Sequence, residues 1–596
     1  MNMIPHFKKF SRSLNDTYGL TSSPTIALAI SGGGLRSMLV GAGVLSAYDE
    51  ETPGAESQMG GVLQCTSYIA GISGGSWIVM NNLLNDGQSM SHAMDELFMD
   101  LQSPILEGIP NMELNGLRHG LDNEPAETIS AETNKVGLLG SMVEMMLPNF
   151  VKSMFSVGDG GNAFNVKSVL NFYKDISLEA HSKKESGYRI SLIDYWARTL
   201  ARRVIPKRFR SPGFTISSAA KLLSFQNYSQ PFPIITSVEL VPGCSKNSID
   251  SHIIEMTPFE FGSWDSFLNA FMNVKYLGTK LLNGVPMEQD KTIGNMSVCT
   301  SGYDTLAFLT ATSSGLFNTM FRYVYKLLPQ LTDESVPYLQ QVLEIFGFSK
   351  KPDLNQNAFS EYAIYSPNPF LGYHNKELFG RSVENTTSLL LADGGEDGQN
   401  IPFSPFLVPG RQVDAILAFD MGSEVYNRPN GSSLRASANR YHANESQLRI
   451  PLFQDPDGVI RKVFPEIPKN VESYFSSSSH ERPVFFGCEM EDFPKHLGDV
   501  SQGFKLHSGF IPPLIVYQAN HDISFPSNTS TFRTTYSPEE AQGLFSNGYD
   551  LAVNAEDSQY RSCLYCAFMK RKRKHLPDYC QDCFEKYCYK AESSTH

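Results

Sequence analysis

The stretch GISGG, from Gly71 to Gly75, fits the G-x-S-x-G pattern, in which a sharp turn exposes a serine hydroxyl for nucleophilic attack. Glycines flank such a serine because the turn needs unusual dihedrals and has no room for side chains. The turn also sets Ser73 at a helix N-terminus, where positive partial charge favours developing negative charge. The pattern therefore predicts a nucleophile at Ser73, and an ordinary turn of small residues is the alternative.

A second motif, Ser31 to Gly34 with Arg36 two residues later, offers hydrogen-bond donors. Three glycines in a row after a strand can turn backbone N–H groups into one space, which suits an oxyanion or a phosphate. A tight strand–helix turn explains one glycine but not readily three. Arg36 can hold a phosphate with its planar fork of donors or form a surface salt bridge. Neither GxxxxGK[ST] nor a full GxGxxG is present here, which disfavours nucleotide binding.

The third motif, DGGEDG, begins at Asp393. An aspartate that closes an apolar strand and precedes two glycines suits a general base in a cramped site. The acidic run lacks the ligand spacing of a calcium loop, and a plain acidic turn is the alternative. None of the thirteen histidines has the H-E-x-x-H spacing of a metal site. Chain order leaves a Ser-Asp-His triad open, because four histidines follow Asp393: His442, His480, His507 and His521.

Short apolar runs precede each of these motifs. Thr25–Ile30 and Thr66–Ala70 stop at glycines, and apolar residues at helical spacing follow both runs. Two later runs, Leu389–Ala392 and Ala415–Phe419, stop at aspartates. Buried strands that alternate with helices predict an α/β fold, with a central mixed, largely parallel sheet flanked by helices. A Met-rich segment, Val136–Val157, suits a lid or a membrane-touching surface, but its spacing favours a core helix broken at a proline.

The composition bounds the class of protein. Lys and Arg number 49 against 62 Asp and Glu, which gives a net charge of −13, and 41% of the residues are hydrophobic. Such a chain can fill a core, and its acidity argues against nucleic acid as a partner. The sequence contains no run of 18 consecutive apolar residues, so it predicts no membrane-spanning helix. No apolar run of signal-peptide length follows Lys8, Lys9 and Arg12, so we expect no signal peptide in this chain.

The cysteines and glycosylation sequons bear on the compartment. Five of the nine cysteines crowd near the C-terminus: Cys563, Cys566, Cys580, Cys583 and Cys588. Their spacing suits a zinc ribbon, a disulfide-stapled tail or free thiols. The other four can be buried apolar fillers: Cys65, Cys244, Cys299 and Cys488. Seven sequons support secretion only weakly: Asn15, Asn227, Asn295, Asn385, Asn430, Asn444 and Asn528.

Taken together, these motifs resemble the fungal phospholipase B, or lysophospholipase, family, which is related to the catalytic domain of cytosolic phospholipase A2. The matching stretches include SGGGLRSMLVGAGVLSAYD from Ser31, GISGGSWIV from Gly71 and LADGGEDGQNIPFSP from Leu391. They occur in family order and cover nearly the whole chain. The resemblance implies a patatin-like or cytosolic phospholipase A2-like fold with long insertions. Leu35 and Ser37 depart from the residues common in the family.

The resemblance implies a serine acyl hydrolase that releases fatty acids from lysophospholipids and glycerophospholipids. Ser73 would attack the ester and form an acyl-enzyme, and Asp393 would accept its proton directly. The N–H groups of Gly33 and Gly34 would stabilise the oxyanion, and Arg36 would hold the lipid phosphate. The resemblance implies no metal or other cofactor, and no calcium requirement is expected. The implied partners are these lipids and a membrane or micelle surface touched peripherally; nucleic acid is not one, and the oligomeric state stays unassigned.

The resemblance also predicts a domain plan and a location. Residues 1–24 would form a short lead-in, 25–560 a single catalytic domain, and 561–596 a cysteine-rich tail packed on or near it. The C-terminal cysteines look like disulfide partners in the family, which makes zinc the minority hypothesis. Secreted members carry a signal peptide and a further N-terminal stretch, so we expect the secretory pathway or the cell exterior, with an intracellular location left open. The alternatives are a Ser-His-Asp esterase and a catalytically silent lipid-binding or regulatory member of the fold.

Overall fold

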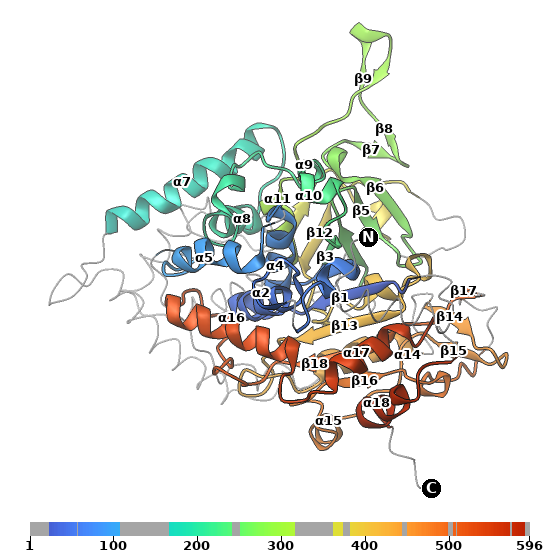
Figure 1. Ribbon diagram of the computed structural model, residues 1–596. Helices are drawn as coiled ribbons and strands as arrows, with labels where there is room; N and C mark the ends of the chain where they lie inside the picture. Colours follow the sequence, from blue (N-terminus) through green and yellow to red (C-terminus); the bar gives the residue numbers. More distant parts are fainter. Residues whose placement is uncertain are drawn as a thin grey trace, which may run out of the picture.

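The computed structural model describes residues 23–55, 58–86, 88–105, 107, 166–240, 251–315, 362–373, 382–443, 450–498, 505–507, 509–572 and 575–590. An eleven-stranded sheet lies at its centre (Figure 1). Nine strands follow each other across it: β16 (Val484–Phe486), β18 (Leu514–Ala519), β13 (Ala415–Asp420), β1 (Ile26–Ile30), β2 (Thr66–Gly71), β3 (Phe232–Glu239), β4 (Ile253–Met256), β5 (Glu260–Ser263) and β6 (Ala270–Asn273). Two more branch from β3: β12 (Leu389–Asp393) and, beside it, β11 (Ala363–Tyr365).

The five strands at the centre, β18, β13, β1, β2 and β3, are parallel. Antiparallel strands extend the sheet on both sides. The mixed sheet confirms the predicted fold class. Each of the four predicted strands forms within one residue of its predicted bounds, as β1, β2, β12 and β13. All four are almost wholly buried, which is why the sequence shows them as continuous apolar runs.

Helices cover the sheet (Figure 1). The longer ones are α2 (Gly34–Tyr48), α4 (Gly74–Leu84), α5 (Met90–Asp100), α7 (Val166–Glu185), α8 (Leu192–Arg203), α11 (Leu306–Ser313), α14 (Ser432–His442), α16 (Pro538–Val553), α17 (Tyr560–Met569) and α18 (Tyr579–Tyr587). Alternate side chains of β1 point to opposite faces of the sheet, so they belong to two different cores. Ile26, Leu28 and Ile30 lie in the core that includes α2, α4 and α16, and the alanines of β1 lie in the other core. Among the described residues, no helix combines the length and apolar character needed to cross a membrane.

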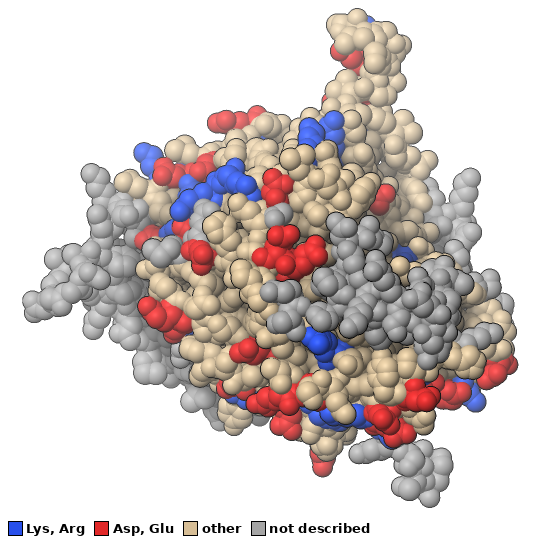
Figure 2. Space-filling view, in the orientation of Figure 1, with Lys and Arg blue, Asp and Glu red and all other residues tan. Residues whose placement is uncertain are grey.

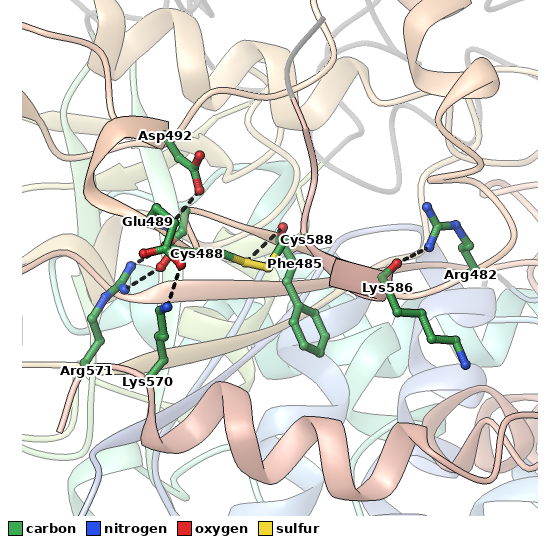
Figure 3. Close-up of a disulfide and its surroundings, with 10 residues drawn as sticks. Arg482, Phe485, Cys488, Glu489, Asp492, Lys570, Arg571, Lys586 and Cys588 are labelled. Carbon is green, nitrogen blue, oxygen red and sulfur yellow. Dashed lines mark hydrogen bonds and ion pairs between the residues drawn. A yellow bond between two sulfur atoms is a disulfide. The ribbon is translucent and has the colours of Figure 1, made fainter. Parts of the chain in front are cut away.

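Three disulfides organise the C-terminal segment. Cys563–Cys583 and Cys566–Cys580 join α17 to α18, and Cys488–Cys588 joins the end of α18 to the segment after β16 (Figure 3). Nearby, the Arg571 guanidinium donates to the carbonyl of Cys488 at 3.3 Å. The bridges consume the thiols that a zinc ribbon needs. The interpretation of Cys488 as an apolar filler was wrong, because Cys488 forms a disulfide with Cys588. The two cysteines lie 100 positions apart in the chain.

Other sequence-based expectations have mixed outcomes. Cys299 is exposed, so the filler interpretation was also wrong there, whereas Cys65 is half-buried and free. Cys244, the segment Val136–Val157 and the sequons at Asn15 and Asn444 lie outside the described residues. The division into lead-in, catalytic domain and tail stays a prediction.

A narrow arm leaves the sheet edge after β6, at the top of Figure 1. Its strands are β7 (Leu281–Leu282), β8 (Val285–Pro286), β9 (Gln289–Asp290) and β10 (Met296–Ser297). They pair only with each other, as β7 with β8 and β9 with β10. A small separate sheet is formed by β14 (Pro451–Gln454), β15 (Ile460–Lys462) and β17 (Lys505–His507).

Candidate active site

Strands β2 and β12 share one edge of β3 and run toward each other. β2 pairs in parallel with the first half of β3, where Gly71 lies opposite Ile235. β12 pairs antiparallel with the second half, where Asp393 lies opposite Ser237. β4 occupies the other edge of β3. The carboxyl ends of β2 and β12 therefore meet end to end, although Ser73 and Asp393 are 393 − 73 = 320 positions apart in the chain.

Ser73 occupies the turn between β2 and α4, as predicted for a nucleophile elbow. Its backbone has φ 53° and ψ −124°, a conformation that side chains disfavour and that is often found at functional sites. The Ser73 N–H donates to the Ser313 carbonyl at 3.0 Å, and the Gly394 N–H donates to the same oxygen at 3.4 Å. One carbonyl at the end of α11 thus ties the nucleophile turn to the aspartate loop. Nothing in the sequence marked Ser313 for this contact.

The glycines of the first two motifs allow backbone to pack on backbone. A Cβ atom on Gly74 would lie 2.0 Å from the carbonyl oxygen of Gly34, and one on Gly75 would lie 2.4 Å from that of Ile30. A Cβ atom on Gly32 would lie 2.9 Å from the Cβ of Ser73. The glycine loop and the serine turn are therefore in direct contact. This contact explains why both motifs lack side chains.

Gly33 and Gly34 are buried and have positive φ angles of 150° and 62°. Within the part of the chain that the structure describes, neither N–H donates to a protein acceptor. The N–H of Gly74, the residue after Ser73, shares this property. Donors that are held rigidly and not engaged by the protein suit a developing oxyanion. Gly74 was missing from the predicted set, although the nucleophile-elbow pattern places one donor at that position.

Asp393 ends β12 and is buried. Its Oδ1 accepts a hydrogen bond from the Gly395 N–H at 2.8 Å, within the turn that follows. Asn400 closes the same loop and reaches the glycine motif: its Nδ2 donates to the Gly32 carbonyl at 3.1 Å, and the Gly32 N–H donates to the Asn400 carbonyl at 3.0 Å. No local sequence pattern marks Asn400, because its partner Gly32 lies 368 positions away.

Arg36 is completely buried in the first turn of α2. Its Nη2 donates to the Met421 carbonyl at 2.7 Å and to the Thr531 hydroxyl at 3.1 Å, and its Nη1 donates to the Thr529 carbonyl. The guanidinium thus joins the glycine loop, the end of β13 and the 529–531 segment. Its predicted role as a phosphate ligand stays a prediction.

The end of β13 supports the glycine loop from the other side. The Ser31 N–H donates to the Phe419 carbonyl at 3.1 Å, and the Met421 N–H donates to the Ser31 hydroxyl at 2.6 Å. Between these two contacts lies Asp420, whose carboxylate accepts from the Tyr517 hydroxyl at 2.8 Å. Burial, and then the charge of Glu424, raise the pKa of Asp420 to about 7. Burial thus favours the protonated form of Asp420, next to the main-chain contacts that hold the glycine loop.

The late histidines bond elsewhere. The ring of His521 is hydrogen-bonded to the Ala519 carbonyl at 2.9 Å, and that of His442 to the Phe464 carbonyl at 2.9 Å. Burial lowers the pKa of both rings. Among the described residues, no hydrogen bond joins a histidine ring to Ser73, and no group of three or more potential ligands could hold a metal ion.

Comparison with known proteins bears on this site. A family model described as the lysophospholipase catalytic domain matches residues 26–111 and 144–594. A lysophospholipase of Torulaspora delbrueckii is 32% identical, with 95% of this chain and 75% of the relative covered. Lysophospholipase 1 of Saccharomyces cerevisiae is 33% identical, with 97% and 75% covered.

Among solved structures, human GIVD cytosolic phospholipase A2 is similar in fold. Its TM-score is 0.55 at 15% sequence identity, and the match covers 94% of this chain. The chain spans 63% of the length of that structure. The likeness confirms the α/β architecture that the motifs implied. Since the family model spans most of the sequence and both yeast relatives align along nearly all of it, the chain belongs to the lysophospholipase catalytic-domain family.

Proposed function

We propose that this chain is a serine acyl hydrolase that releases fatty acids from lysophospholipids and glycerophospholipids through a Ser73–Asp393 dyad. Membership of the family makes it a lipid hydrolase, and the dyad is our inference from the site. One observation carries it: β2 and β12 meet end to end on β3, and the Ser313 carbonyl joins the turns that follow both strands. A serine and a carboxylate held in this way can exchange a proton without a histidine.

In the acylation step, the Ser73 Oγ attacks the ester carbonyl carbon while Asp393 accepts its proton. The negative charge on the carbonyl oxygen is stabilised by the N–H groups of Gly33 and Gly34. When this tetrahedral intermediate collapses, the ester C–O bond breaks, and the glycerol oxygen leaves with the proton from Asp393. The fatty acyl group remains bound to Ser73 as an ester.

In the deacylation step, Asp393 takes a proton from a water molecule that attacks the acyl-enzyme. The same donors stabilise the second oxyanion. Collapse breaks the bond to the Ser73 Oγ, which recovers its proton from Asp393. The products are a free fatty acid and the original enzyme.

For Arg36 we propose that a lipid phosphate would replace the 529–531 segment as acceptor. The support is that Arg36 donates to two groups of that one segment, the Thr529 carbonyl and the Thr531 hydroxyl, besides the Met421 carbonyl. Arg36→Lys keeps the charge but loses the fork, so we expect KM for lysophosphatidylcholine to rise about tenfold while kcat changes less. Equal KM values for lysophosphatidylcholine and an uncharged monoacylglycerol in both proteins would contradict phosphate binding.

Two alternatives make different predictions. A Ser-His-Asp esterase requires a late histidine, and the contacts of His442 and His521 with main-chain carbonyls give it no support. A silent lipid-binding protein has no physical need for a strained serine beside an aspartate loop and unengaged N–H groups. Fatty-acid release from phosphatidylcholine and lysophosphatidylcholine, compared between wild type and Ser73→Ala, tests the proposal. Background release by both proteins would favour the silent alternative.

We further propose that catalysis needs no metal, so the same assay should give equal rates with calcium and with EDTA.

Peripheral contact with a lipid surface is proposed through the arm of β7 to β10. Its apolar side chains are 40–63% exposed: Leu282, Val285, Met287, Ile293, Met296 and Val298. Figure 2 shows mostly uncharged residues on this projection. Co-sedimentation with phosphatidylcholine vesicles should fall in the double variant Ile293→Ser/Met296→Ser.

We propose that the chain enters the secretory pathway and is a glycoprotein. Three disulfides suit an oxidising compartment. The asparagines of four sequons are exposed, namely Asn227, Asn295, Asn385 and Asn528. A glycosidase-induced shift of the native protein, together with protease protection in isolated vesicles, tests this location. A glycan at Asn295, on the arm, would also contradict lipid contact at that point.

A further inference from the structure

Asn400 lies between the two loops that carry the proposed chemistry. It ends the loop that begins at Asp393, and its side chain contacts the glycine loop. A Cβ atom on Gly32 would lie 2.2 Å from the Asn400 Oδ1, and one on Gly395 would lie 2.7 Å from the same atom. The amide is therefore packed between glycines of both loops. Only residues without a side chain leave room for it.

The hydrogen bonds of Asn400 hold the peptide groups on both sides of the Gly32 Cα. Its Nδ2 donates to the Gly32 carbonyl at 3.1 Å, and its own carbonyl accepts from the Gly32 N–H at 3.0 Å. The Gly32 carbonyl and the Gly33 N–H belong to the same planar trans peptide, so they point in opposite directions. A donor that holds the carbonyl thereby fixes the direction of the N–H. It also polarises the peptide, which strengthens that N–H as a donor.

We propose that Asn400 is a positioning residue that aims the Gly33 N–H at the oxyanion of the acyl-transfer step. The role rests on the proposed function, and it adds a residue that acts through the glycine loop. The second donor is held differently: the carbonyl of the Gly33–Gly34 peptide accepts from the Ser37 N–H at 3.5 Å, at the start of α2. Gly32 precedes the helix and has no helical partner; its carbonyl accepts from the Asn400 amide at 3.1 Å and from the hydroxyl of the preceding Ser31 at 3.2 Å. Asn400 also ties this donor to the loop of the base.

The test compares three variants at two neighbouring positions. Asn400→Ala removes the amide, and Asn400→Asp keeps its shape but replaces the donor with an acceptor facing the Gly32 carbonyl. Gln399→Ala is the matched control, because the Gln399 side chain donates to Asp397 within the same loop, at 2.6 Å. We expect kcat to fall on the order of tenfold to a hundredfold in both Asn400 variants, with KM little changed. Gln399→Ala should stay within about threefold of wild type in kcat.

A second readout separates aiming of the donor from loosening of the loop. A fatty-acyl trifluoromethyl ketone adds to a serine as a tetrahedral oxyanion, so its affinity reports on the oxyanion site. Its affinity should fall by the same factor as kcat/KM in both Asn400 variants and stay unchanged in Gln399→Ala. A purely structural role predicts that the isosteric Asn400→Asp performs better than Asn400→Ala.

The inference is overturned if Asn400→Asp keeps kcat and ketone affinity within threefold of wild type. It is also overturned if Gln399→Ala loses as much activity as the Asn400 variants, because general loop stability would then explain both. Full activity in Ser73→Ala and Asp393→Asn would instead overturn the proposed dyad. The two failures are therefore distinguishable in one assay series.

Discussion

Ser73→Ala is expected to lower fatty-acid release by about 10⁴-fold or more, because no other group in the proposed mechanism can carry the acyl chain. The loss should appear in kcat for phosphatidylcholine and for lysophosphatidylcholine alike. A lipid-like fluorophosphonate should label wild type at one serine and leave Ser73→Ala unlabelled. The measurement is single-turnover release of labelled fatty acid together with mass analysis of the adduct.

The fold should survive this change, since the hydrogen bonds that Ser73 makes with the described residues use its main chain rather than its hydroxyl. A matched variant sharpens this point. Ser73→Gly also lacks the hydroxyl but relaxes the backbone at φ 53°. The free energy of unfolding of Ser73→Gly should be about 1 kcal/mol higher than that of Ser73→Ala. Both variants should be equally inactive. Equal stability of the two variants in urea would show that the turn is not strained.

Asp393→Asn should abolish turnover by about the same factor, because an amide cannot accept the proton of Ser73. The side-chain oxygen that accepts from the Gly395 N–H at 2.8 Å remains available in asparagine. The protein should therefore keep its thermal stability and lose its reactivity toward the fluorophosphonate. Stopped assays and a fluorescence-monitored melt measure the two properties separately.

The control for this second prediction is Asp393→Ala, which loses both the base and the acceptor for the Gly395 N–H. It should be as inactive as Asp393→Asn but less stable, by about 1–2 kcal/mol. Substantial activity in Asp393→Asn would eliminate the dyad and return attention to a histidine base. In that event the variants of His442 and His521 become the informative ones.

Much of the sheet was predictable from local pattern. A strand buried on both faces must be apolar throughout, so β1, β2, β12 and β13 stand out in the sequence as short apolar runs that stop at glycine or aspartate. The serine turn was predictable as well, because its glycines are required by the turn itself. Both signals are local, and a local signal survives in a linear sequence.

Three contacts at the site were not predictable. Asn400, the Ser313 carbonyl and the acceptors of Arg36 are defined by partners between 81 positions away (394 − 313 = 81, for Gly394 and Ser313) and 495 positions away (Thr531 and Arg36). A carbonyl carries no signature of residue type, and an asparagine in a loop more often serves its own turn. The pairing of Cys488 with Cys588 was not predictable for the same reason. The spacing within the CxxC pairs does not indicate a bond between cysteines 100 positions apart.

The sequence by itself determined the residue types that can react, the turns that expose them and the apolar strands that precede them. Their assembly was decided by the tertiary structure. Two strands from distant parts of the chain run toward each other along one edge of β3, and this pairing brings together the turns that carry Ser73 and Asp393. The physical reason is that strand pairing depends on main-chain hydrogen bonds and on the burial of both faces. These conditions are satisfied only when the whole sheet has formed.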